Sequence, residues 1–196
     1  MSQSDPAQAA ETDGRRRRTL DSRARIIAAM LELTREGHIS VSAESVAERA
    51  RVGLRTVFRH FRDMDSLYRE MSLIMEARFA EETGAAFTRA DWRGRLSEMI
   101  GRRAGIFEKI TPFKRAEAAH RHRSRFLDHD ARRLNRRLRD ALRGILPPEI
   151  KEDESLFEAL DLLLSFESWH RLRREQGLSV RRAREALTQA VTRLVA

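Results

Sequence analysis

The stretch ARVGLRTVFRHFRDMDSL, residues 50–67, combines cationic and apolar side chains at helical spacing. On a helical wheel of about 100° per residue, its apolar side chains fall within one arc of roughly 100°, the width of a stripe that faces a core. That arc contains Leu54, Val57, Phe58 and Phe61. The opposite side carries Arg55, Thr56, Arg59 and His60. The pattern predicts a short helix over 54–61 that is docked on one side and cationic on the other.

A helix of two turns is too short to be stable alone, so its apolar side needs a partner. The preceding segment, residues 43–50, predicts a helix whose N-cap is Ser42. A short turn with Gly53 joins the two. Two short helices with such a turn, the second one basic, are typical of a helix-turn-helix, in which arginines can bind guanine or phosphate.

Composition is compatible with this hypothesis. The chain has 196 residues, no cysteine and a net charge of +9. Positive charge favours polyanions such as nucleic acid, and the absence of cysteine excludes disulfides and thiolate metal sites. The start has no secretory signal pattern and no apolar run could cross a bilayer, so we expect a cytoplasmic protein that does not enter membranes.

Helical patterns follow one another along the chain, with no strand-like alternation, and predict an all-α fold of about nine helices. We expect a disordered N-terminal arm over 1–18, in which Arg15–Arg18 either contact DNA or form a solvated tail. Residues 19–64 are expected to form the three-helix DNA-binding head, and 65–83 a connecting fourth helix. Residues 84–196 are expected to form a helical domain for effector binding and dimerisation. The predicted helices of this domain cover 91–110, 130–146, 153–176 and 179–195, with Pro112 as an interruption after the first.

Residues 42–67, SAESVAERARVGLRTVFRHFRDMDSL, resemble the DNA-binding head of the TetR/AcrR family of transcriptional regulators. The family pattern is close to A-G-V-S-x-x-T-[LI]-Y-x-H-F-x-x-K-[ED]-x-L. The residues at matching positions are Ala50, Val52, Thr56, Val57, Phe58, His60, Phe61, Asp65 and Leu67. The first helix, RIIAAMLELTREG, and the tail, WHRLRREQGLSVRRAREALTQAVTRLV, also resemble the family, so the likeness covers nearly the whole chain.

Four positions depart from the family pattern. Arg51 replaces the turn glycine, and Gly53 replaces the serine expected to cap the second helix. Phe58 replaces a tyrosine and so lacks its hydroxyl, and Met64 replaces a lysine. The charges of Arg51, Arg55, Arg59 and Arg62 are expected to compensate for the lost phosphate contacts.

The resemblance implies a ligand-responsive repressor that binds a palindromic operator as a homodimer. The residues expected to contact DNA are Ser42, Arg51, Arg55, Thr56, Phe58, Arg59 and His60. The resemblance also implies a small-molecule effector, for which an apolar compound is favoured. No cofactor and no catalytic residue are expected, and the chain is not expected to be an enzyme.

The second half of the chain supplies candidates for two further surfaces. Residues 153–176 are apolar nearly all round the wheel, which favours a subunit interface with the last helix. The interface candidates are Leu156, Leu160, Leu163, Phe166, Leu187, Val191 and Leu194. The candidates for an effector pocket are Met71, Met75, Phe79, Ile100, Phe107, Phe113, Phe126 and Trp169. Such stripes are more often plain core than pocket.

Two other functions compete with specific DNA binding. The segment His120–Asp130, HRHRSRFLDHD, contains His120, His122, Asp128, His129 and Asp130, all of them possible metal ligands. This segment is compatible with a metal-sensing regulator or, less well, with an HD-type metal-dependent phosphohydrolase. The other competitor is a basic protein that coats any duplex without sequence preference.

Overall fold

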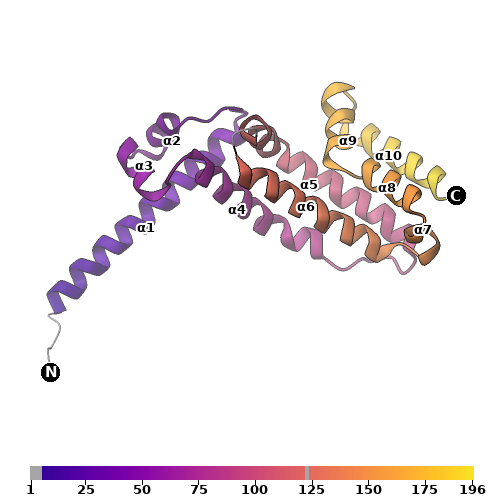
Figure 1. Cartoon of the computed structure of the whole chain (residues 1–196), viewed down its shortest axis with the longest axis horizontal. Helices are drawn as coiled ribbons and strands as arrows, with labels where there is room; N and C mark the ends of the chain where they lie inside the picture. The colour runs from indigo at the N-terminus through magenta and orange to yellow at the C-terminus, as the bar shows by residue number, and fades with distance from the viewer. Residues whose placement is uncertain (1–5, 122–123) are drawn as a thin grey trace. The chain divides into compact units, whose positions relative to one another are not determined.

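The structure, a computed structural model, describes residues 6–121 and 124–196, and every regular element within them is helical (Figure 1). In chain order the elements are α1 (Pro6–Arg35), α2 (Ala43–Ala50), α3 (Leu54–His60), α4 (Met64–Gly84), α5 (Trp92–Arg121), α6 (Arg125–Ile145), α7 (Pro148–Glu152), α8 (Glu154–Leu163), α9 (Phe166–His170), the π-helix η1 (Arg171–Glu175) and α10 (Val180–Leu194). The predicted all-α fold is therefore confirmed. None of the helices described combines the length and the apolar character that a membrane span requires.

The chain divides into two compact units. The first contains residues 1–74 and 112–127, and the second contains 75–111 and 128–196. The first unit is larger than the predicted head of residues 19–64, because the end of α5 packs on the beginning of α4. There the rings of Tyr68 and His120 stack with centroids 4.4 Å apart, and Ser72 hydrogen-bonds the buried carboxylate of Glu117.

In the first unit α1, α2 and α3 lie against one another (Figure 1). Their core is built from Ile26, Met30, Val46 and Val57, which are all buried. The predicted N-cap of α2 is confirmed, since the Ser42 hydroxyl accepts a hydrogen bond from the backbone N–H of Ser45 at 3.2 Å.

Asp63 caps α4 in the same way, accepting from the N–H of Ser66 at 2.8 Å. Gly37, just after α1, has φ +99°, a conformation that glycine adopts without steric cost and that is common at helix ends.

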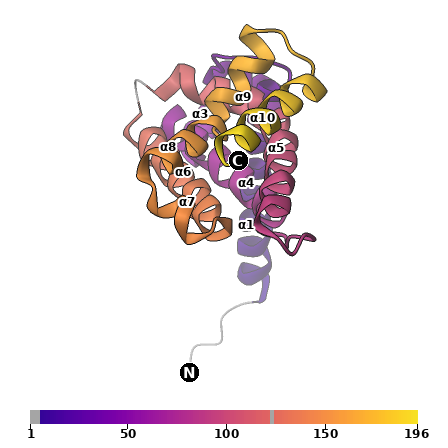
Figure 2. The same ribbon diagram turned by 90° about the vertical axis from the view of Figure 1, so that its right-hand side faces the viewer.

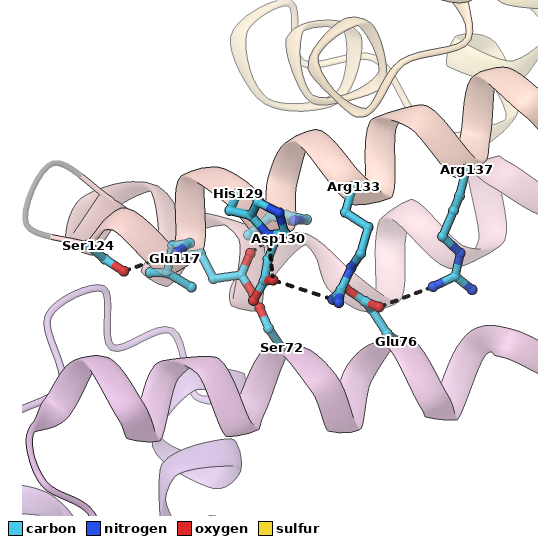
Figure 3. A network of polar contacts seen from close by, with 10 residues as sticks. Ser72, Glu76, Glu117, Ser124, His129, Asp130, Arg133 and Arg137 are labelled. Carbon is cyan, nitrogen blue, oxygen red and sulfur yellow. Dashed lines mark hydrogen bonds and ion pairs between the residues drawn. The ribbon is translucent and has the colours of Figure 1, made fainter.

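The second unit is held together by buried apolar contacts and by ion pairs between helices. α8 and α10 lie side by side (Figure 2), with Leu160, Leu187 and Val191 buried. Figure 3 shows Arg133 and Arg137 of α6 reaching Glu76 of α4, with N–O distances of 2.8 and 3.1 Å. These contacts fix α6 along the second half of α4.

Arg103 is a buried cation in this unit. It donates to the backbone oxygens of Leu164 at 2.9 Å and Leu138 at 2.6 Å. Burial lowers the pKa of Arg103 to about 10, against a smaller opposing effect of Asp161. Its donors satisfy the carbonyl at the end of α8, so Arg103 is best understood as structural.

Three predicted boundaries differ from the structure. Residues 6–18, expected to be disordered, form the start of α1, whereas residues 1–5 of the same predicted arm lie outside the described residues. Pro112, expected as an interruption, lies inside α5. The proline removes one backbone donor, and its neighbours Thr111 and Phe113 are both buried, so packing outweighs that loss.

The predicted continuous helix over 153–176 is split into α8, α9 and η1. Ser165 causes the break, because its hydroxyl accepts from the N–H of Ser168 at 3.1 Å and starts α9 as an N-cap. The apolar residues around this segment therefore belong to two helices. The segment is therefore not one helix that is apolar on all sides, as the sequence predicted.

Three of the predicted interface residues are already used inside the chain. Leu160, Leu187 and Val191 are buried in the second unit, so their side chains are not available to a second subunit. Leu156, Leu163 and Phe166 are half-buried, and Leu194 is exposed.

Arg51, the C-cap of α2, has left-handed backbone angles, φ 53° and ψ 50°. It is the only non-glycine residue with positive φ in the described part of the chain. Its N–H bonds to the carbonyls of Ala47 and Glu48, so the turn requires this conformation. A non-glycine residue pays about 1–2 kcal/mol for it.

We therefore expect Arg51→Gly to raise the free energy of unfolding by about 1 kcal/mol in urea titrations, because glycine adopts left-handed angles without steric cost. Arg55→Gly makes the same chemical change inside α3 and should instead lower it by about 1 kcal/mol. Equal effects of the two substitutions would contradict this explanation.

Candidate nucleic-acid interface

The buried side chains of α3 show which of its sides is docked. We call the side that faces solvent, together with the preceding turn, the outward face. Val57 is 1% exposed, and Phe61, just after the helix, is 4% exposed. Thr56 and His60 are half-buried. On the wheel these residues occupy one side, so the docked side is centred between Val57 and His60. The opposite side faces solvent.

This orientation corrects the predicted apolar arc. Leu54 and Phe58, expected to be docked, are 38% and 47% exposed. They lie about 40° apart on the wheel and adjoin Arg55 and Arg59, which are exposed. The exposed face of α3 is therefore half apolar and half cationic. Leu54 was expected only to be docked, because an apolar side chain at this spacing usually faces a core, and its exposure depends on how α3 packs.

Three arginines lie on this face. Neither Arg51, Arg55 nor Arg59 contacts a carboxylate within the part of the chain that is described. Other arginines of the same unit do, such as Arg49 of α2, whose guanidinium donates to both carboxylate oxygens of Glu36 at 2.7 and 2.8 Å. The three charges on the face are left available to an external anion.

Arg23 of α1 supports the docked side of α3. Its guanidinium lies 5.1 Å from the ring centroid of Phe61, within the range of a cation–π interaction. The same group pairs with Glu70 of α4 at 3.0 Å. One side chain thus connects α1, α4 and the end of α3. Arg25 adds a contact to the carbonyl of Ala50 at 3.4 Å.

The remaining predicted DNA-binding residues differ in how available they are. Ser42 is exposed, although its oxygen already caps α2. Gly53 provides no side-chain cap for α3, as its identity predicted. Thr56 is half-buried, which limits but does not prevent contact with a phosphate.

His60 has a buried Nε2 atom with no hydrogen-bond partner among the described residues. Burial lowers the pKa of His60, and the charges of Arg59 and Arg23 lower it further. The imidazole is therefore held neutral near pH 7, and any contact of His60 with DNA is that of a neutral side chain.

The pocket candidates are divided between the two units. Met71, Phe113 and Phe126 belong to the first unit, and the others to the second. All of them are buried except Phe126, which is 50% exposed and lies against the guanidinium of Arg69 at 4.9 Å. Its exposure excludes Phe126 from an enclosed core.

The metal hypothesis finds no geometric support among the described residues, where no three His, Asp or Glu side chains group as ligands. His120 stacks on Tyr68 in the first unit. Asp128, His129 and Asp130 belong to the second, and the His129 side chain is 77% exposed. His122 lies outside the described residues.

Solved structures of regulators share this fold. A candidate transcriptional regulator from Streptomyces coelicolor A3(2) matches with a TM-score of 0.60 and 24% sequence identity, over 88% of this chain and 97% of that one. A TetR transcriptional regulator from Rhodococcus sp. RHA1 matches with a TM-score of 0.50 and 18% identity, over 90% of this chain and 96% of that one. No family model and no curated protein sequence matches the chain. The expected TetR-like architecture is confirmed at the level of the fold.

The lowered pKa of His60 predicts a specific pH dependence of stability. In the unfolded chain histidine titrates near its usual value of about 6.5. As the pH falls below that value, the unfolded chain takes up the proton first. The stability linked to neutral His60 is therefore present above pH 6.5 and lost as the pH falls through the lower folded-state pKa.

We expect His60→Gln to remove this loss. Urea titrations between pH 7.5 and 5 should show wild-type stability falling faster than that of the variant. His129→Gln, at an exposed site, serves as the control and should follow the wild type. Parallel curves for wild type and His60→Gln would show that His60 is not held neutral by the fold.

Proposed function

We propose that this chain is a sequence-specific DNA-binding transcriptional regulator, and more narrowly a ligand-responsive repressor that binds a palindromic operator as a homodimer. The observation that carries the proposal is the outward face of the turn and α3. There Arg51, Arg55 and Arg59 are exposed and have no acidic partner among the described residues, while Val57 and Phe61 are buried on the opposite side of the helix.

A rigid helix with unpaired arginines suits the major groove of DNA. Arginine binds O6 and N7 of guanine through two parallel hydrogen bonds, and it also neutralises phosphates. The net charge of +9 adds a general attraction to the duplex. A protein that only coats DNA would need no anchored helix, so the docking of α3 favours sequence-specific binding.

The homodimer is supported by apolar surface on α8 and α10. Leu162 is 65% exposed, Val180 42% and Leu194 39%. Large exposed apolar side chains on adjacent helices are typical of an interface between subunits. A two-fold dimer carries two α3 helices, which is why we propose a palindromic operator.

The response to a ligand rests on the regulator-like fold and on the buried Met and aromatic side chains of the second unit, among them Met75, Phe79 and Phe107. We propose an apolar effector that favours a conformation with weaker operator binding. Candidate compounds are found by their ability to raise the melting temperature and to release the protein from its operator.

If the chain binds specific DNA, selection of bound sequences from a random pool of duplexes should enrich one palindromic sequence. Arg55→Ala and Arg59→Ala should each weaken binding to it by about 5- to 150-fold, as expected for the loss of a base contact worth about 1–3 kcal/mol. Far-UV circular dichroism should be unchanged, since both side chains are exposed.

Arg78→Ala is the matched control, because it removes the same charge from an exposed position on α4, outside the proposed DNA-binding face and dimer interface. Its operator affinity should stay near that of the wild type. If the two α3 variants and the control lose affinity equally, only overall charge matters and the protein coats DNA. If no sequence is enriched at all, the proposed function is wrong.

The dimer proposal predicts that Leu162→Glu separates the subunits, because it places a charge on the proposed interface. Analytical ultracentrifugation should give half the wild-type mass, and operator affinity should fall because a single head binds one half-site. Leu73→Glu, at a 39% exposed position of α4, should remain dimeric. A monomeric wild type would refute the proposal directly.

A further inference from the structure

Leu54 and Phe58 form an exposed apolar pair on α3, and the arginine contacts proposed above do not explain their exposure. They are 38% and 47% exposed on a helix of seven residues. Residues four apart lie on the same side of a helix, so the two side chains form one small apolar strip. Exposing both side chains to water is unfavourable unless a ligand covers them.

The neighbours of this strip restrict what can cover it. Arg55 and Arg59 follow the strip along one side, and Arg51 precedes it in the turn, all three without acidic partners in the described structure. An occupant therefore has to offer anionic or acceptor groups beside a small apolar surface. The strip is only two side chains wide, far less than a stable protein interface requires.

A duplex that contains thymine meets both requirements. In the major groove the C5-methyl of thymine is the apolar group on the base edges, and guanine O6 and N7 are acceptors for arginine. Neither Leu54 nor Phe58 can hydrogen-bond a base edge, and the Phe58 ring has no hydroxyl for a phosphate. Contact with a methyl group is the specific interaction open to them.

We infer that Leu54 and Phe58 recognise thymine C5-methyl groups in the major groove, adjacent to guanines bound by Arg55 or Arg59. The inference rests on the proposed DNA-binding function and adds to it a base preference and two residues that determine specificity. Each operator half-site should then contain at least one thymine next to a guanine, and the methyl group itself should contribute to affinity.

The test replaces each thymine of the selected operator in turn by deoxyuridine, which removes only the methyl group. Burial of one methyl group corresponds to roughly a fourfold change in affinity. We expect one or two thymines in each half-site to show such a loss with the wild-type chain, measured by fluorescence anisotropy. Thymines outside the half-sites should show none.

Substitutions of Leu54 and Phe58 test whether this apolar strip causes the loss of affinity on deoxyuridine replacement. In Leu54→Ala or Phe58→Ala, the deoxyuridine penalty at one thymine should disappear, while Phe58→Leu should retain part of it. Leu73→Ala, at a similarly exposed leucine of α4, should keep the full wild-type penalty. Because the first series uses only the wild-type chain, it remains decisive even where a variant folds poorly.

The outcomes separate the inference from the proposed function. If a preferred sequence is selected but no deoxyuridine replacement matters, or the penalty persists in both alanine variants, the methyl contact is refuted while specific DNA binding stands. If no sequence is selected, the proposed function fails first. Half-sites without thymine would also refute the inference.

Discussion

The attachment of α3 to the rest of its unit is the constraint on which the candidate site depends. Seven residues are too few for a helix that is stable alone. The helix is fixed by two buried side chains, Val57 and Phe61, and by Arg23, which contacts the Phe61 ring and also pairs with Glu70. Because these contacts define the docked side, they also define which side chains face outward.

The sequence was sufficient to place the helices of this region but not to orient α3. The N-cap at Ser42, the missing cap at Gly53 and the turn at Arg51 follow from local chemistry, and the structure agrees with each. Orientation is a tertiary property. Four apolar residues on an arc do not reveal which of them are docked, so the exposure of Leu54 and Phe58 could not be derived from the wheel.

The same distinction explains the second unit. The turn at Gly177 and the N-cap at Ser179 were predictable, and both are present, with φ +67° at Gly177 and the Ser179 hydroxyl accepting from Arg182 at 3.3 Å. The break at Ser165 was missed because apolar residues continue on both sides of it. Periodicity also could not tell a buried intrachain leucine such as Leu160 from an interface leucine such as Leu162, since both are apolar and helical.

Residues 51–60 concentrate features that a stability-optimised turn would avoid. Arg51 occupies a conformation that favours glycine, α3 begins without a side-chain cap, and Phe58 is exposed. His60 has a buried nitrogen with no hydrogen-bond partner in the part of the chain that the structure describes. The neighbouring helices have the side-chain cap that α3 lacks, because Ser42 caps α2 and Asp63 caps α4. Local departures of this kind persist where another requirement outweighs stability. Here they coincide with Arg51, Arg55 and Arg59, which have no acidic partner in the described part of the chain, so the proposed contact with a nucleic acid accounts for why these departures lie together.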